Sequence, residues 1–200
     1  MIRGRLLIAT TNPGKLREIT RILEGVPLEI VRLEALPPIA EPEETGSTFA
    51  ENARLKALYY SRAAGLPSVA DDSGLEIEAL GGIPGIHSAR WQGTDYGVKF
   101  ARIYELLRAG GAAGSRARFV CALALAVDDR IEFESEGVVQ GEIAAEPRGS
   151  HGFGYDPIFF YPPLGRTLGE IPDELKEGVS HRGAAFRALR EYLVRLPTFP

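Results

Sequence analysis

The chain has 200 residues, 44% of them hydrophobic, so it can bury one sizeable core, and we expect a single domain spanning residues 1–200 with room for two lobes. Its 23 basic and 27 acidic side chains give a net charge of −4, which argues against general affinity for nucleic acid. The single cysteine, Cys121, excludes an intrachain disulfide and is typical of a reducing cytosol. The apolar run at 6–9 is too short for a signal peptide, and no later run reaches membrane-spanning length. We therefore expect a cytoplasmic protein without a membrane partner.

The first part of the chain predicts alternating strands and helices. In chain order we expect a strand at 5–9, a helix at 16–23, a strand at 28–33, a Pro- and Glu-rich loop at 35–47, a helix at 49–64, and strands at 68–70 and 75–80. Thr48 and Glu51 are spaced as a capping box at the start of the 49–64 helix. The sequence Asp-Asp-Ser-Gly at 71–74 is interpreted as a turn between the last two strands.

The second part of the chain adds a long hairpin. We expect a glycine-punctuated loop at 81–93, a helix at 96–108, strands at 116–127 and 130–143, a Gly- and aromatic-rich loop at 149–165 around the short apolar run 158–161, and helices at 173–178 and 183–196. Asp128 and Asp129 would form the tight turn between the two long strands. Strand–helix units combined with a hairpin predict an α/β fold, with a mixed sheet flanked by helices.

Lysine is rare in this chain. Of the 23 basic residues only Lys15, Lys56, Lys99 and Lys176 are not arginine. A GC-rich or thermophilic source explains such a ratio, but it does not explain which lysines remain. A compact, rotatable ammonium group suits a phosphate oxygen or a crowded carboxylate better than a planar guanidinium does. Three of the four lysines lie in the polar clusters described below, whereas Lys99 is expected on an exposed helix surface.

Two carboxylates are adjacent at Asp71 and Asp72, and their repulsion costs free energy unless a cation lies nearby. Carboxylate oxygens suit Mg²⁺, which usually takes one or two of them and leaves its other positions to water and phosphate. Glu44, in the acidic loop 43–46, and one aspartate would supply such a site. The other aspartate would orient or deprotonate a water molecule. The alternative, a capped turn and an acidic loop in solvent, stays open.

The segment Thr-Thr-Asn-Pro-Gly-Lys at 10–15 lies between a strand and a helix start, where free N–H groups and the helix dipole suit a phosphate. It lacks the spacing of a P-loop, and a plain turn with an asparagine cap is the alternative. Asn52 and Lys56, four residues apart, share one face of the helix that follows the acidic loop.

A second set of clusters lies late in the chain. The segment Gly-Phe-Gly-Tyr-Asp-Pro at 152–157 could stack its aromatic rings on a planar base, although both rings could equally be core residues. Lys176 and the segment Ser-His-Arg at 180–182 follow, and a helix start with an exposed histidine and arginine is the alternative there.

Seven motifs occur in order between Leu7 and Leu193: T-x-N-x-x-K, E-E-T-G, F-x-E-N-A-x-x-K-A, A-D-D-S-G-L, G-G-x-P-G-I-x-S-A-R-W, F-G-Y-D-P-I-F and S-H-R-G. Together they resemble the inosine triphosphate pyrophosphatase family, the non-canonical purine (dITP/XTP) pyrophosphatases. The resemblance implies an elongated α/β fold of two lobes around a long mixed sheet, with the active site in the cleft. It also implies a Mg²⁺-dependent homodimer that hydrolyses ITP, dITP and XTP to the monophosphate and pyrophosphate.

The same resemblance assigns roles to residues. Glu44 and Asp72 match metal ligands, Asp72 also matches the proton acceptor, and Lys56 matches a catalytic lysine on the phosphate side. Glu43 and Asp71 are further metal candidates. The positions that match substrate contacts are Thr10, Thr11, Asn12, Pro13, Gly14, Lys15, Ser73, Phe153, Gly154, Tyr155, Asp156, Lys176, His181 and Arg182. Thr11 departs from the family, which often has glycine there, and its side chain narrows the approach of the main chain to phosphate.

Two other functions stay open. One is a pyrophosphatase of pyrimidine or modified nucleotides, as in the structurally similar septum-inhibitor family, although the F-G-Y-D and S-H-R-G motifs speak against it. The other is a nucleotide sensor without turnover, although a binder has no need of a water-activating base. Inosine and xanthosine carry a 6-oxo acceptor where adenine carries an amino donor, so a buried donor facing that edge would reject ATP.

Overall fold

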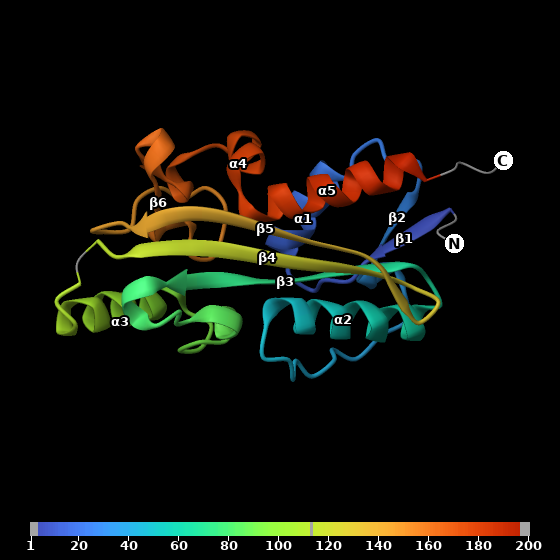
Figure 1. Ribbon diagram of the computed structural model, residues 1–200, viewed down its shortest axis with the longest axis horizontal. Helices are drawn as coiled ribbons and strands as arrows, with labels where there is room; N and C mark the ends of the chain where they lie inside the picture. The colour runs from blue at the N-terminus through green and yellow to red at the C-terminus, as the bar shows by residue number, and fades with distance from the viewer. Residues whose placement is uncertain (1–3, 113, 197–200) are drawn as a thin grey trace. The chain divides into compact units, whose positions relative to one another are not determined.

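The computed structural model of the chain describes residues 4–112 and 114–196 and confirms an α/β fold (Figure 1). Its strands are β1 (Arg5–Ile8), β2 (Glu29–Arg32), β3 (Ser68–Ile77), β4 (Arg116–Val127), β5 (Arg130–Ile143), β6 (Phe159–Tyr161) and β7 (Arg166–Thr167). Its α-helices are α1 (Pro13–Ile22), α2 (Phe49–Ala64), α3 (Tyr96–Ala109), α4 (Asp173–Val179) and α5 (His181–Arg195). Among the described residues, none of these helices is long and apolar enough to cross a bilayer.

The seven strands form one mixed sheet in the order β2-β1-β3-β4-β5-β6-β7. β1 runs parallel to β2 and β3, whereas β6 runs antiparallel to β5 and β7. The chain divides into two compact units. The first contains residues 4–72, 121–137 and 181–196, and the second contains residues 73–120 and 138–180. Each unit has its own hydrophobic cluster.

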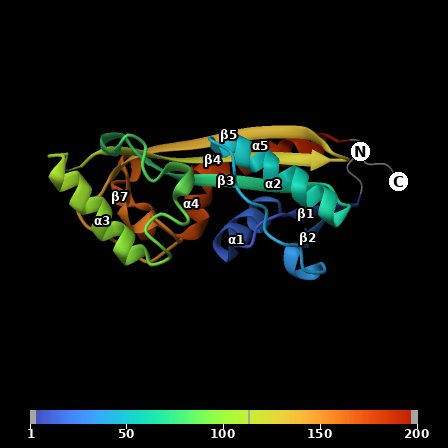
Figure 2. The same cartoon turned by 90° about the horizontal axis from the view of Figure 1, so that it is seen from below.

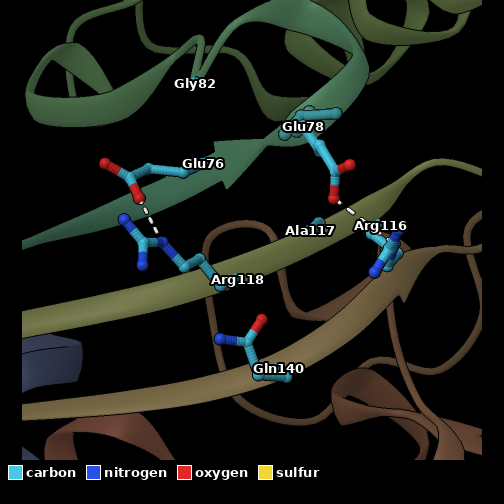
Figure 3. Close-up of a pocket in the computed structure, with 8 residues that line it drawn as sticks. Glu76, Glu78, Gly82, Arg116, Ala117, Arg118 and Gln140 are labelled. Atoms are coloured by element: carbon cyan, nitrogen blue, oxygen red, sulfur yellow. Dashed lines mark hydrogen bonds and ion pairs between the residues drawn. The ribbon is translucent and has the colours of Figure 1, made fainter.

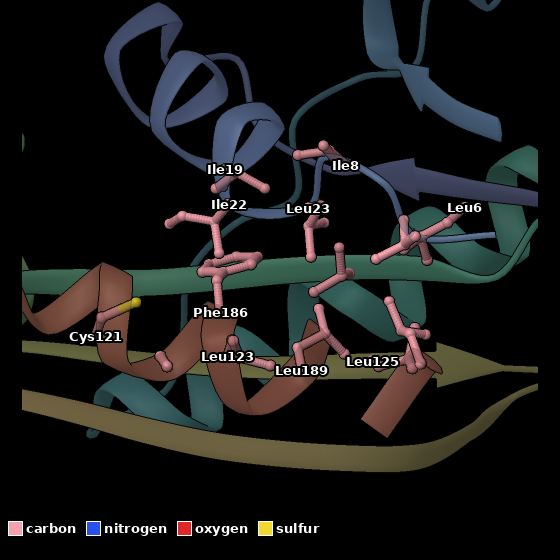
Figure 4. Packing of buried hydrophobic residues seen from close by; sticks show 14 of the residues in the cluster. Leu6, Ile8, Ile19, Ile22, Leu23, Cys121, Leu123, Leu125, Phe186 and Leu189 are labelled. Atoms are coloured by element: carbon pink, nitrogen blue, oxygen red, sulfur yellow. The ribbon is translucent and has the colours of Figure 1, made fainter. Parts of the chain in front are cut away.

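In the first unit, α1 and α5 contact each other and cover one face of the strands, and α2 covers the opposite face (Figures 1 and 2). Leu6 and Ile8 of β1 belong to the cluster beneath α1 and α5, together with Phe186 and Leu189 of α5 (Figure 4). Leu7 points to the other face, because side chains alternate along a strand, and it is buried too. The strands are thus covered on both faces, which explains their continuous apolar runs.

In the second unit, α3 contributes Ile103 and Leu107 to a cluster with Leu75 of β3. Phe119 of β4 and Phe159 of β6 pack with their ring centroids 4.6 Å apart in the same cluster. These aromatic contacts fix β6 and the loop before it, which contains the predicted base-binding segment.

Several predicted boundaries are confirmed. α2, β4 and β5 begin and end where the sequence patterns place them. Asp128 and Asp129 have φ angles of 46° and 67°, so both are left-handed, as a two-residue hairpin turn requires. The predicted capping box is half right: Thr48 accepts a hydrogen bond from the Glu51 N–H, but the Glu51 carboxylate accepts from the N–H and hydroxyl of Ser47 instead.

Other boundaries are corrected. The predicted turn at 71–74 is wrong, because β3 continues without a break from Ser68 to Ile77. The predicted 16–23 helix begins earlier, at Pro13, and the 183–196 helix begins at His181. β7 has only two residues, which is too short to leave a periodic pattern in the sequence.

Candidate active site

Asp71 and Asp72 are neighbours within β3, and their side chains therefore point to opposite faces of the sheet. Asp71 meets Lys15 of α1, whereas Asp72 meets Lys56 of α2. The repulsion expected between adjacent carboxylates is relieved because each has its own cation on its own side. The cation expected near the two carboxylates is therefore a lysine on each face of the sheet, Lys15 for Asp71 and Lys56 for Asp72.

Asp71 is the anionic centre of a buried cluster. Its Oδ2 lies 3.0 Å from Lys15 Nζ and 3.5 Å from the Arg182 guanidinium. Arg182 in turn lies 2.7 Å from the Glu18 carboxylate. Burial tends to raise the pKa of Asp71, but Lys15 and Arg182, with a smaller effect of Lys56, outweigh it and hold the pKa below its usual value. Asp71 therefore stays ionised and fixes two cations in place.

Asp72 lies in a different cluster. Lys56 Nζ is 2.7 Å from Glu44 Oε1 and 3.3 Å from Asp72 Oδ1. The Asn52 side chain donates to Asp72 Oδ2 at 3.1 Å and accepts from the Gly46 N–H at 2.8 Å, which ties the acidic loop to α2. Burial, and to a lesser degree Glu44, raise the pKa of Asp72 above its usual value, although Lys56 opposes them. Asp72 is therefore the more basic of the two aspartates, which suits a proton acceptor.

The predicted donors for a divalent cation, Glu44 and Asp72, converge on the one ammonium group of Lys56. Two carboxylates fit the chemistry of Mg²⁺, which needs no larger protein cage. Among residues 4–112 and 114–196, no group of three or more His, Cys, Asp or Glu side chains could hold a metal by itself. Glu44 and Asp72 alone fit an ion that would complete its coordination with water and phosphate. Glu43, next to Glu44, is exposed.

The predicted phosphate segment forms the start of α1. The Asn12 side chain caps the helix by accepting from the Lys15 N–H at 3.1 Å, and the Asn12 N–H donates to Thr10 Oγ1 at 3.2 Å. Thr11 and Pro13 are exposed, and Gly14 is buried. The segment thus presents a helix N-terminus with a lysine in its first turn, and Lys15 is held by Asp71.

The late motifs form a second cluster, in the second unit. Asp156 Oδ2 accepts from Lys176 Nζ at 2.5 Å and from the Phe153 N–H at 2.7 Å. Lys176 Nζ also lies 4.8 Å from the centroid of the Phe153 ring. Asp156 and Lys176 are both 2% exposed, so they form a buried pair that closes the turn carrying Phe153. A side chain at Gly152 would collide with the Asp156 carboxylate, so this turn requires glycine there.

The remaining predicted contacts lie on regular elements. Ser73 is half-buried in β3, in the second unit, and Gly154 is half-buried in the loop beside Phe153. His181 and Arg182 are buried in the first turn of α5, in the first unit. The suggested exposed histidine and arginine at a helix start are therefore wrong.

Lys99 is the clearest error of the sequence reasoning. It was expected on an exposed helix surface, but it is 0% exposed on α3. Its Nζ donates to the carbonyl oxygens of Ser88 and Ala89 at 3.0 and 2.7 Å. Tyr155, a predicted base contact, donates its hydroxyl to the same Ser88 carbonyl at 2.9 Å. Lys99 and Ser88 were both missed; the scarcity of lysine was a usable signal for the first.

Glu18 was also missed, although it lies one helical turn beyond Lys15 in α1 and shares a face with the helix start.

Elsewhere, the second unit has a hollow of about 440 Å³ over β3, β4 and β5 (Figure 3). Its charged side chains are already paired, Glu76 with Arg118 at 2.5 Å and Glu78 with Arg116 at 3.3 Å. None of the predicted site residues lines it.

Comparison with known proteins identifies the family. The Ham1 family model matches residues 6–192. The dITP/XTP pyrophosphatase of Syntrophobacter fumaroxidans is 48% identical over 92% of this chain and 80% of its own length, and that of Gloeobacter violaceus is 48% identical over 92% and 91%. The structure of a HAM1 protein from Coxiella burnetii superposes with a TM-score of 0.87 at 38% identity, covering 96% of this chain and 100% of the other. The chain belongs to the Ham1 family.

Proposed function

We propose that this protein hydrolyses ITP, dITP and XTP to the corresponding monophosphate and pyrophosphate, and so removes deaminated purines from the nucleotide pool. The relatives named dITP/XTP pyrophosphatases support the substrate class, since they match at up to 48% identity over most of the chain. The observation that carries the chemistry is the cluster of Asp72, Lys56 and Glu44, in which a buried carboxylate of raised pKa lies beside an ammonium group.

In this proposal, Asp72 accepts a proton from the attacking water, and its raised pKa makes it a better acceptor than an ordinary aspartate. Lys56 and Lys15 stabilise negative charge that develops on the phosphates. Desolvation by burial opposes the ammonium form of Lys56, but Asp72, Asp71 and Glu44 together outweigh it and raise the pKa of Lys56 above its usual value. Lys56 is therefore cationic at neutral pH.

Glu44 and Asp72 would hold a Mg²⁺ ion, which supplies positive charge to the triphosphate when bound. The Asp71 carboxylate is the fixed partner of Lys15 and Arg182. Titration calorimetry with MgCl₂ on wild type and on Glu44→Gln tests the metal site. If Glu44→Gln binds Mg²⁺ as tightly as wild type does, Glu44 is not a ligand of the metal ion.

For the base, we propose that Phe153 stacks on the purine. Polar groups of the segment 153–156 and Lys176 form hydrogen bonds to the edge of the purine. The 6-oxo group of hypoxanthine and xanthine accepts hydrogen bonds, whereas the 6-amino group of adenine would leave a buried donor unpaired. His181 and Arg182 are the further candidates for nucleotide contacts. The fixed turn around Asp156 supports this role, because a preorganised site loses less entropy on binding.

The test is release of pyrophosphate and of orthophosphate from ITP, dITP, XTP, GTP, ATP and dTTP in the presence of Mg²⁺. We expect rapid pyrophosphate release from the first three and slow release from the others. Orthophosphate as the primary product would contradict the proposal, and so would a preference for dTTP, which indicates a pyrimidine nucleotide pyrophosphatase. Binding of ITP without any turnover would indicate a sensor.

The resemblance to the inosine triphosphate pyrophosphatases also supports a homodimer acting in the cytoplasm. Sedimentation equilibrium tests the first, with a mass near twice 21.7 kDa expected. The buried free thiol of Cys121 is compatible with a reducing compartment, and fractionation of source cells tests the location.

A further inference from the structure

The Lys99 side chain is enclosed in the second unit without a carboxylate partner among the described residues. Its ammonium group bonds to the carbonyl oxygens of Ser88 and Ala89 and lies 4.4 Å from the centroid of the Tyr96 ring. The Tyr155 ring centroid is 5.7 Å away. The cation is therefore stabilised by main-chain dipoles and by the faces of aromatic rings.

A buried ammonium group is an expensive way to fill space. Fully buried lysines are rare because desolvation disfavours the charge, and here burial lowers the pKa of Lys99 below its usual value. Leucine or methionine would fill the same volume without that penalty. A packing role alone therefore does not explain why this position carries a cation. The hydrogen bonds to the Ser88 and Ala89 carbonyl oxygens explain it, because they need a donor here.

One of those bonds shares its acceptor, the Ser88 carbonyl oxygen, with the predicted base-binding segment. The Ser88 carbonyl accepts from both Lys99 Nζ, at 3.0 Å, and Tyr155 Oη, at 2.9 Å. The Ser88 hydroxyl accepts from the Leu75 N–H of β3 at 2.9 Å and donates to the Gly85 carbonyl at 2.6 Å. One residue thus links α3, β3, the loop around 88 and the segment 153–156.

The ring of Tyr155 is fixed as firmly as its hydroxyl. It packs edge-to-face on Tyr96 with a centroid distance of 5.2 Å and an interplanar angle of 84°, and it lies 6.2 Å from the Phe100 ring. Tyr96 and Phe100 flank Lys99 on α3. Gly154 lies over the Tyr96 ring, since a side chain there would lie 3.5 Å from the Tyr96 hydroxyl. The start of α3 is therefore the platform on which residues 154 and 155 rest.

We propose that Lys99 is a positioning residue for purine recognition: through the Ser88 carbonyl that it shares with Tyr155, its ammonium group holds the segment 153–156 in the geometry that binds the base. The inference rests on the proposed function, because that function assigns the base to this segment. Lys99 touches neither the base nor the reacting phosphates in this scheme.

A residue that shapes base recognition without touching the reacting atoms should act on KM and on the choice of base more than on kcat. Lys99→Met keeps the volume and removes the cation. Tyr155→Phe keeps the ring and removes only the bond to Ser88. Because both variants break the same link, their effects should not add when the two changes are combined. A loss of stability alone would produce neither a KM effect nor this coupling.

The experiment is steady-state kinetics with ITP and ATP, at a temperature well below unfolding, on wild type, Lys99→Met, Tyr155→Phe and the double variant. Arg102→Met is the matched control, since it removes a cation from the exposed side of the same helix. We expect KM for ITP to rise about tenfold in both single variants with kcat changed less than about threefold, and the double variant to resemble the singles. The preference for ITP over ATP should narrow, and Arg102→Met should behave as wild type.

Unchanged KM in both single variants of an enzyme that hydrolyses ITP would overturn the inference, and so would strictly additive effects. If Lys99→Met does not fold, Tyr155→Phe alone decides, because it preserves packing: an unchanged KM and base preference then contradicts the proposal. Absence of ITP hydrolysis by the wild type would instead contradict the proposed function. The two failures are therefore distinguishable in the same set of assays.

Discussion

The Asp72 carboxylate shares Lys56 with Glu44 and has a pKa raised mainly by burial, whereas Asp71 is held ionised by Lys15 and Arg182. Asp72→Asn keeps the shape but removes the proposed proton acceptor, so turnover of ITP should fall by about 100-fold or more. Folding should survive, because Lys56 retains Glu44 as its partner. Turnover near that of wild type would move the role of proton acceptor to another carboxylate.

Asp71→Asn should destabilise the fold more than Asp72→Asn does. It leaves Lys15 and Arg182 without their shared buried anion, and removing one partner from a buried ion pair costs about 3 kcal/mol or more. Urea unfolding should therefore show a much larger loss in the free energy of unfolding for Asp71→Asn than for Asp72→Asn. Equal losses in the two variants would contradict the separate roles.

All four lysines turn out to be enclosed. Lys56, Lys99 and Lys176 are 9%, 0% and 2% exposed, and the Lys15 side chain is 16% exposed. Lys99 thus also places a compact ammonium group in a confined polar site, where its partners are carbonyl oxygens.

Lys15→Arg and Lys56→Arg should each impair hydrolysis of ITP although the charge is kept. The planar guanidinium is wider than the ammonium group and should displace the carboxylates or the phosphates from their positions. A loss in kcat indicates a contact that strengthens in the transition state, and a loss in KM indicates one that only holds substrate. Arg102→Lys, at an exposed position on α3, is the control and should stay within about 0.5 kcal/mol of wild type in stability. Wild-type kinetics in both lysine variants would leave their phosphate roles without support.

At the scale of elements, strong local signals were sufficient for α2 and for the hairpin of β4 and β5. α2 combines an N-cap at Thr48 with a left-handed glycine, Gly65, just after its last residue. β3 was misread because Asp, Asp, Ser and Gly favour turns in isolation. The strand persists because cations from α1 and α2 reach it from both sides, and such tertiary contacts leave no local pattern in the sequence.

In the candidate site too, local sequence patterns predicted some features, and tertiary contacts determine the rest. The motifs located the residues that carry charge, because their types and spacing are unusual. They could not show that Asp156 pairs with Lys176, twenty residues later, or that Ser88 and Tyr155, 67 residues apart, meet at one carbonyl. Those contacts depend on how α3 and the loops pack, which single-sequence patterns do not encode.

The approach of α5 to β5 is set by a glycine. A side chain at Gly137 would overlap the His181 carbonyl oxygen and crowd the Ala185 N–H. Gly137→Ala should therefore shift the first turn of α5, which carries His181 and Arg182, lower stability by about 1–3 kcal/mol and weaken hydrolysis. Gly178→Ala is the control: apart from its chain neighbours and the backbone of its own helix, no atom of the described residues lies within 4 Å of the added carbon, and stability should be unchanged or higher by up to about 1 kcal/mol. Thermal unfolding and ITP turnover of the two variants check this, and a silent Gly137→Ala would show that α5 can move without loss.

At the scale of the whole molecule, the candidate residues come from segments spread over nearly the full chain, from the start of α1 to the start of α5. The Ham1 family model spans the same stretch, residues 6–192. For the whole enzyme, we propose that a water molecule activated by Asp72 attacks the α-phosphorus of the nucleotide.

Hydrolysis of ITP in H₂¹⁸O tests that claim most directly, because the position of the label reports which phosphorus was attacked. Mass spectrometry of the products should find ¹⁸O in inosine monophosphate and none in pyrophosphate. The Asp72→Asn variant in the same assay gives the background level of ¹⁸O in the products. Label in pyrophosphate would place the attack at the β-phosphorus, and label in orthophosphate would place it at the γ-phosphorus; either result would contradict the account.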